Sequence, residues 1–235
     1  MLASVGTNFR SADFSAAANV VTSMPFLVLG LAGLFRLLIA RDRMRNPPGS
    51  PLVVFMLSLI MVGMGSIFYH WSPSTDHLLW DRLPIAVCLA AFACAMANVY
   101  SGARIGSVLL VPAVLVAVSS VLYWHVSLVH GHEDLRPYIA VQVCSAIWAG
   151  LVVFSRPAQN AGIAGLRLAL IAYTVARIFE LFQQQIYNAS GVDLGHPLKH
   201  LLVAFAAFMV LRSLAQTNGQ TRELPVLQLE LSSGD

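Results

Sequence analysis

The chain of 235 residues is 57% hydrophobic and only 11% charged, against roughly 25% charged residues in an average soluble domain. Its net charge of +3 rests almost wholly on arginine, because Lys199 is the only lysine. This composition excludes an ordinary soluble globular domain, and so mild a basic excess argues against a nucleic-acid-binding protein. Since a bilayer-spanning helix needs about 20 apolar residues, the chain has room for about seven such helices and little else.

Long apolar runs, separated by polar or proline-rich connectors, predict an all-α integral membrane bundle of seven transmembrane helices. The expected spans are residues 18–39, 52–70, 80–99, 105–124, 137–154, 163–187 and 197–215. We expect an N-terminal outer segment at residues 1–17 without a cleavable signal peptide, because this segment lacks a basic stretch followed by a continuous apolar run. Residues 18–215 then form the membrane domain, and the polar residues 216–235 form a mobile inner tail.

The arginine distribution predicts the orientation of the bundle, since the inner loops of membrane proteins carry an excess of Lys and Arg. An inner location for the connector after the first span places eight arginines inside, namely Arg36, Arg41, Arg43, Arg45, Arg104, Arg156, Arg212 and Arg222. Only three basic residues, Arg10, Arg136 and Lys199, fall outside. The prediction is an outer N-terminus and an inner C-terminus, with every histidine-bearing connection on the outer side.

Ionisable side chains within apolar helices are costly, so each one is a candidate functional residue. Ser66 and His70 lie four residues apart at the outer end of the second span and therefore share one helical face. Asp81 lies near the outer start of the third span. Each has a simple structural alternative, because an interfacial histidine can bond a carbonyl or headgroup and a carboxylate is stabilised at a helix N-terminus.

Two further pairs lie near the outer ends of the last two spans. His196 and His200 share a face at i, i+4 spacing, which lets two imidazoles bind one metal ion. Arg177 and Glu180, at i, i+3, predict an ion pair within one helix, and Glu180 could instead hold the second nitrogen of a metal-ligating histidine. The outer-loop histidines, His125, His130 and His132, are interpreted as solvated loop residues, with a zinc-entry or lid role as the alternative.

The predicted orientation places His70, Asp81, His196 and His200 at one depth on the outer side. Three neutral imidazoles with an open fourth position are the ligand set of a catalytic zinc site. A nearby carboxylate could carry protons, and a hydroxyl could donate to an oxyanion. The set predicts a metal-assisted hydrolase with the three histidines as Zn²⁺ ligands, Asp81 as proton carrier and Ser66 as oxyanion donor.

These motifs resemble those of the alkaline ceramidase family, part of a superfamily of seven-helix membrane hydrolases that includes the adiponectin and progestin receptors. The matching motifs are Ser-x-x-x-His at 66–70, Asp-x-Leu-Pro at 81–84 and Gly-His-x-x-Lys-His at 195–200. Residues 19–26 and 176–180 also look like family positions. The resemblance implies zinc-dependent hydrolysis of an N-acyl sphingoid lipid, lying within the bilayer, to a fatty acid and a long-chain amine.

The chain also departs from the family pattern. Eukaryotic members bind calcium through an acidic N-terminal segment, whereas residues 8–18 offer only Asp13, so we expect no calcium site. Arg82 follows the aspartate, and Gln183 and Gln184 stand where another acid is expected, which leaves headgroup selectivity open. The compact chain with short loops looks like a bacterial member, which implies an inner-membrane protein whose site faces the periplasm.

Three other classes fit part of the sequence. A lipid-binding receptor with a structural zinc and little or no turnover would share the three histidines. A di-histidine haem protein would need neither a third histidine nor a carboxylate, and a transporter should show paired broken helices. The hydrolase is the favoured prediction and the receptor its main alternative.

Overall fold

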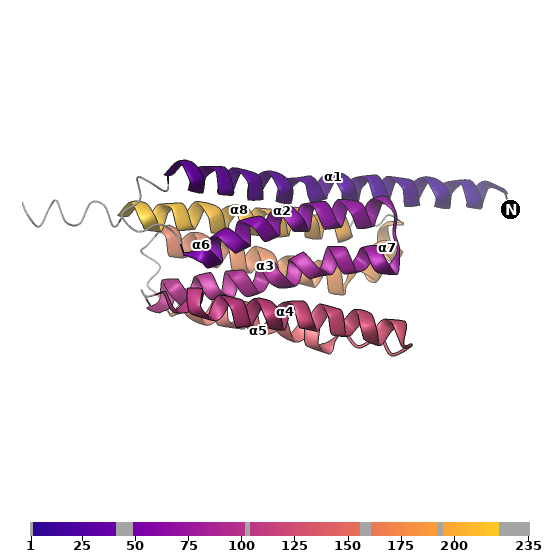
Figure 1. Ribbon diagram of the computed structural model, residues 1–235. Helices are drawn as coiled ribbons and strands as arrows, with labels where there is room; N and C mark the ends of the chain where they lie inside the picture. Colours follow the sequence, from indigo (N-terminus) through magenta and orange to yellow (C-terminus); the bar gives the residue numbers. More distant parts are fainter. Residues whose placement is uncertain (1, 41–48, 102–103, 156–160, 192–194, 221–235) are drawn as a thin grey trace, which may run out of the picture.

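The computed structural model describes residues 2–40, 49–101, 104–155, 161–191 and 195–220. Within these ranges the regular structure is helical throughout (Figure 1). The helices are α1 (Leu2–Ala40), α2 (Ser50–Trp71), α3 (Thr75–Ser101), α4 (Ile105–Val129), α5 (Arg136–Phe154), α6 (Ala161–Leu181), α7 (Gln183–Ser190) and α8 (Gly195–Gln220). The predicted all-α class is confirmed.

The helix bounds differ from the expected spans in three places. Helix α1 begins at Leu2, and its first turns extend beyond the ends of the other helices (Figure 1); no proline precedes Pro25 to interrupt it. The expected sixth span is divided near Phe182, where the apolar run gives way to the polar residues of α7. Helix α8 continues through Gln220, and the rest of the expected tail lies outside the described residues.

Helices α1 to α6 each contain a stretch long and apolar enough to cross a membrane. Helix α8 is a seventh long helix, of 26 residues, whose first turns carry His196, Lys199 and His200. These polar residues lower its average hydropathy, although the helix is as long as its neighbours. Large apolar side chains cover the outside of the bundle, as shown by Val108, which is 77% exposed. Such a surface suits lipid rather than water.

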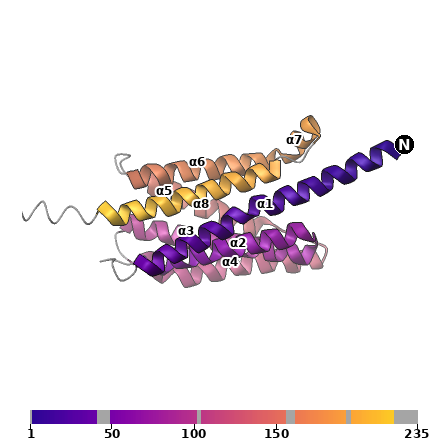
Figure 2. The same cartoon turned by 90° about the horizontal axis from the view of Figure 1, so that it is seen from above.

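Six of the long helices form a ring, and α4 lies outside it. Helix α1 packs against α2 and α8, α8 packs against α6, and α5 closes the ring between α6 and α3, which also packs against α2. Helix α4 packs mainly on α3 and α5. Figure 2 shows α1 running diagonally across α2 and α8. One end of the bundle holds α7, the turn between α2 and α3 and the turn between α4 and α5 (Figure 1); we call it the α7 end.

Two glycines bring α2 unusually close to its neighbours at the α7 end. A Cβ atom added at Gly63 would lie 2.8 Å from the Leu27 backbone nitrogen of α1. A Cβ atom added at Gly65 would lie only 2.2 Å from the Trp80 carbonyl oxygen of α3. Small residues at helix contacts allow this backbone approach in membrane bundles. The close contacts at Gly63 and Gly65 place Ser66, which follows Gly65, between α1 and α3.

Candidate metal centre

Three histidines meet at the α7 end of the ring. His70 lies in the last turn of α2, while His196 and His200 lie in the first turns of α8. Their ligand nitrogens all lie within 4.8 Å of one another, and the Nε2 atoms of His70 and His196 are 3.2 Å apart. The prediction that these three residues come together is confirmed, and the cluster could hold a metal ion.

One distance within the cluster matches the separation of two ligands in a zinc site. Zinc–imidazole bonds of about 2.0–2.1 Å in a tetrahedral site place two ligand nitrogens about 3.3–3.4 Å apart, close to the 3.2 Å between His70 and His196. The Nδ1 atom of His200 contacts the hydroxyls of Thr22 and Ser23, each at 3.2 Å. That contact leaves the Nε2 atom of His200 as its ligand atom. His70 and His200 are only 8% and 6% exposed, which limits competition from bulk water.

The other two predicted catalytic residues lie beside the histidines. Ser66 lies one helical turn from His70 and is 2% exposed. Its hydroxyl interacts with the carboxylate of Asp81, across the close α2–α3 contact at Gly65. A carboxylate and a hydroxyl therefore lie together within one helical turn of His70. Their catalytic roles remain proposals.

Sequence reasoning missed the contribution of α1. The Ser23 hydroxyl contacts both the His200 ring and the Ser66 hydroxyl, the latter at 2.9 Å. Residues 19–26 resemble family positions, but no role followed from that likeness, because a hydroxyl within a helix usually bonds its own backbone. Thr22 and Ser23 do bond backbone carbonyls one turn back and use their remaining capacity on His200. The adjacent polar residues Thr22 and Ser23, within an otherwise apolar span, were the sequence feature that could have indicated this role.

The predicted ion pair on α6 is present. Arg177 and Glu180 form a salt bridge within the helix, and the other carboxylate oxygen of Glu180 lies 3.2 Å from the Nζ atom of Lys199. Glu180 therefore links α6 to the turn of α8 that carries the two histidines. The hydroxyls of α1, rather than this carboxylate, contact the second nitrogen of His200. Glu180 and Lys199 both also lie close enough to Asp81 to act on its carboxylate electrostatically.

The remaining histidines make local contacts. The Nδ1 atom of His130 lies 2.8 Å from the Val126 carbonyl oxygen, one turn back at the end of α4. His125 lies 3.8 Å from the carboxylate of Asp76, and the His77 ring packs on Phe68. The backbone of His132 bonds the last turn of α4. His130 and His132 are exposed in the turn after α4, as expected of solvated loop residues, whereas His125 lies within α4 and its side chain is only 21% exposed.

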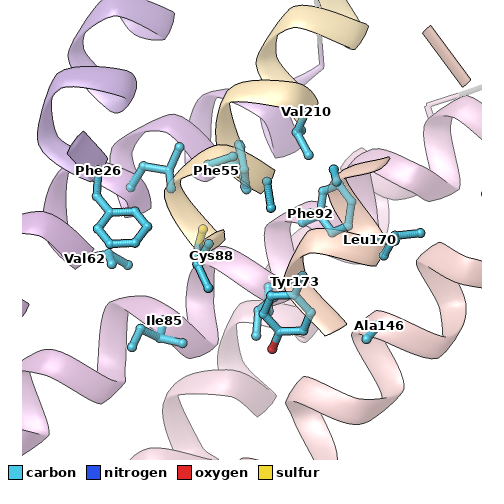
Figure 3. A pocket seen from close by; sticks show the side chains of 16 residues that line it. Phe26, Phe55, Val62, Ile85, Cys88, Phe92, Ala146, Leu170, Tyr173 and Val210 are labelled. Atoms are coloured by element: carbon cyan, nitrogen blue, oxygen red, sulfur yellow. The ribbon is translucent and has the colours of Figure 1, made fainter. Parts of the chain in front are cut away.

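An apolar cavity lies in the centre of the ring, and one of its lining residues touches the three-histidine cluster. The Phe26 ring, which lines it, packs edge-on against His200 with centroids 6.2 Å apart. The cavity has a volume of about 100 Å³, and its walls come from α1, α2, α3, α5, α6 and α8. Figure 3 shows aromatic and aliphatic side chains converging on it, with the Tyr173 hydroxyl at one wall.

Comparison with known proteins agrees with this architecture. The sequence profile of the ceramidase family matches residues 7–223, nearly the whole chain. A search of the curated proteins found no match. The family match, the six apolar helices and the lipid-exposed outer surface identify a multi-pass integral membrane protein. The matched region contains every residue of the three-histidine cluster, and the chain belongs to the ceramidase family.

Proposed function

We propose that this protein is a zinc-dependent membrane amidase that hydrolyses an N-acyl, ceramide-like lipid to a fatty acid and a long-chain amine. The observation that carries the proposal is the position of the three-histidine cluster, with Asp81 and Ser66 beside it, next to an apolar cavity. A lipid chain inserted into that cavity would present its polar linkage to the cluster. Membership of the ceramidase family supports an amide as that linkage.

The lining of the cavity, rather than its size, suits a lipid chain. Its volume of about 100 Å³ is smaller than the roughly 300–1,000 Å³ typical of small-molecule sites, so it has room for part of a narrow alkyl chain rather than a whole lipid. Its walls are almost entirely apolar, so an alkyl chain could pass from the bilayer into the cavity without leaving an apolar environment. The bundle therefore separates two tasks, with chain binding in the ring centre and chemistry at its α7 end.

The histidines would hold the metal, and the remaining residues would manage protons and charge. A zinc ion with three imidazole ligands lowers the pKa of a water molecule to about 7 and polarises a carbonyl oxygen. The Asp81 carboxylate would accept the proton of the attacking water as the new C–O bond forms. It would then return that proton to the amide nitrogen as the C–N bond breaks, so that a neutral amine leaves. The Ser66 hydroxyl would donate to the carbonyl oxygen as negative charge develops there.

Charged neighbours would hold this end of α8 in place. Lys199 lies between the two histidines in sequence, and its ammonium group is half-buried against Glu180. Arg177 occupies the other oxygen of that carboxylate. We propose that this three-residue network orients the first turns of α8 and thereby His196 and His200. None of the three would need to touch the substrate.

We also propose that α8 is a seventh span and that the α7 end faces outward. The excess of arginine at the opposite connections supports an outer N-terminus. In a bacterial inner membrane the site would open to the periplasm. Cysteine labelling with a membrane-impermeant maleimide tests this topology: a cysteine in place of His132, an exposed residue of the α4–α5 turn, should react in intact cells.

Metal analysis of the detergent-purified protein is the decisive first test. We expect about one zinc ion per chain in the parent, and loss of zinc in both His70→Ala and His200→Ala. His132→Ala is a matched control, because this exposed residue lies in the α4–α5 connection, and it should retain zinc. A metal-free parent protein would refute the proposal.

A lipid-binding receptor with a structural zinc is the second candidate, because it would share the same three-histidine cluster. Asp81→Asn separates the two, since the amide keeps the shape of the side chain but cannot accept the proton. For an enzyme, this variant should keep zinc and lose release of fatty acid from an N-acyl lipid, measured by mass spectrometry. If the parent binds the lipid and zinc but releases no fatty acid, the receptor is the correct assignment.

A further inference from the structure

The Ser23 hydroxyl on α1 contacts two different parts of the candidate site. Its Oγ atom lies 3.2 Å from Nδ1 of His200 and 2.9 Å from Oγ of Ser66. It is also 2.7 Å from the carbonyl oxygen of Asn19. Ser23 is fully buried, at 0% exposure, so bulk water does not compete for these contacts. One side chain therefore joins a metal ligand to the predicted oxyanion donor.

The protons available determine which atom donates in the hydrogen bond between His200 and Ser23. If Nε2 of His200 binds a metal, Nδ1 carries the proton and must donate it. The acceptors within reach are the hydroxyl oxygens of Thr22 and Ser23, each at 3.2 Å, and the Asn19 carbonyl oxygen. The Thr22 hydroxyl proton is already given to the Ala18 carbonyl oxygen at 2.8 Å. Both hydroxyls can therefore accept from His200, which fixes the tautomer that presents Nε2 to the metal.

The same reasoning determines which hydroxyl donates in the hydrogen bond between Ser23 and Ser66. Ser23 has one proton and two acceptors in reach, the Asn19 carbonyl oxygen and the Ser66 hydroxyl. When Ser23 donates to Ser66, the proton of Ser66 must point away from α1. The Asp81 carboxylate interacts with Ser66, and we assign it as the acceptor of this proton. The resulting chain runs from His200 through Ser23 and Ser66 to Asp81, and each bond in it polarises the next.

We propose that Ser23 is a positioning residue that couples the metal ligand His200 to the oxyanion donor Ser66; the inference rests on the proposed zinc amidase function. Ser23 holds His200 in its metal-binding tautomer. It also occupies an acceptor site of Ser66, so the Ser66 proton stays directed to the reaction side. When Asp81 has taken a proton from the attacking water, its neutral carboxyl accepts the hydrogen bond from Ser66 more weakly than the carboxylate did. The Ser66 proton is then free to turn to the charged substrate oxygen.

Zinc affinity, measured by competition with a chelator, tests the proposed effect of Ser23 on His200 independently of catalytic activity. Removing a partner of a metal-ligating histidine typically weakens metal binding about 10- to 100-fold. Because Thr22 remains as a second acceptor, we expect Ser23→Ala to weaken zinc binding about tenfold, towards the lower end of that range. Ser66→Ala, which leaves His200 and its acceptors in place, should bind zinc like the parent. Ser120→Ala is the matched control, since Ser120 is a buried α4 serine that bonds its own helix at Ala117.

A double-mutant cycle of Ser23→Ala and Ser66→Ala, measured on kcat, tests the proposed effect of Ser23 on Ser66. If Ser23 acts through Ser66, the Ser23→Ala effect on kcat should be several-fold in the parent. At saturating zinc it should nearly vanish in the Ser66→Ala background. Ser23→Cys keeps the side-chain size with a weaker hydrogen-bonding group, so its zinc affinity and kcat should fall between those of the parent and Ser23→Ala. The visible absorption spectrum of the Co²⁺-substituted protein is a further measurement: Ser23→Ala should change its bands, and Ser120→Ala should not.

The outcomes separate this inference from the proposed function. Parental zinc affinity and an additive cycle in Ser23→Ala, in a parent that binds zinc and releases fatty acid, would overturn the inference and leave the function intact. A parent without zinc would instead overturn the function. If Ser23→Ala does not fold, Ser23→Cys decides alone: unchanged zinc affinity and kcat in that variant also refute the coupling.

Discussion

The contact between α2 and α3 at Gly65 leads to the sharpest prediction. A methyl group at this position would lie 2.2 Å from the Trp80 carbonyl oxygen, whereas real Cβ contacts do not fall below 3.0 Å. The clashing atom is backbone, so it cannot rotate away. Relief of the clash in Gly65→Ala therefore requires α3 to move by about 1 Å relative to α2.

This displacement acts directly on the candidate site, because Ser66 and Asp81 immediately follow the two clashing residues. Overpacking of this kind costs about 1–3 kcal/mol of stability, and a misplacement of about 1 Å costs about 100-fold in rate. We expect Gly65→Ala to lose about that much kcat. Zinc should largely remain, since the cluster is formed between α2 and α8 rather than between α2 and α3.

The assay pairs fatty-acid release with zinc content and thermal unfolding in one detergent. Gly150→Ala is the control, because a Cβ atom at that α5 glycine would have no neighbour within 4 Å; it should match the parent in all three. Parental kcat in a folded Gly65→Ala would show that the close helix contact does not set the Ser66–Asp81 geometry.

Three more predictions concern the cavity, the α6–α8 network and the α4–α5 turn. Val210→Trp, at the cavity wall far from the histidines, should lower kcat/KM for the longest acyl chains by roughly 10- to 200-fold relative to short ones, measured on a chain-length series. Glu180→Gln should lower stability by about 2 kcal/mol, and Lys199→Met by less, because Glu180 then keeps one cation; thermal unfolding compares them. Arg136 holds the pKa of the Asp134 carboxyl below its usual range, so the stabilisation of this turn should be complete at neutral pH and fade as pH falls below about 4. An NMR titration should show the pKa of Asp134 rising in Arg136→Gln.

Controls make these outcomes decisive. Val108→Trp adds the same bulk on the exposed outer face of α4 and should leave the chain-length profile unchanged. Equal losses for short and long acyl chains in Val210→Trp would mean that the cavity does not bind the acyl chain. If Lys199→Met were the less stable of the two α6–α8 variants, the three-residue network would be wrongly assigned.

Several features of this protein follow from the sequence because they are local. The apolar runs predicted the long helices, and the i, i+4 spacings predicted which polar residues share a helical face. The motifs around His70, Asp81 and His196 are short but lie in helices with almost no other ionisable residues. That scarcity of charge makes the candidate site visible in the sequence alone, and the resemblance to ceramidases rests on the same residues.

Only the tertiary structure decided which helices meet. The spans are apolar on nearly every side, so no amphipathic stripe in the sequence reports which face turns inward. His70 and His196 lie 126 positions apart and come within 3.2 Å only because α2 and α8 meet at one end of the ring. Ser23 reaches His200 because α1 crosses both helices, and Glu180 pairs with Lys199 because α6 packs on α8. The sequence by itself determined the helices and the chemistry they carry; the packing of backbones at residues such as Gly65 decided how that chemistry is assembled.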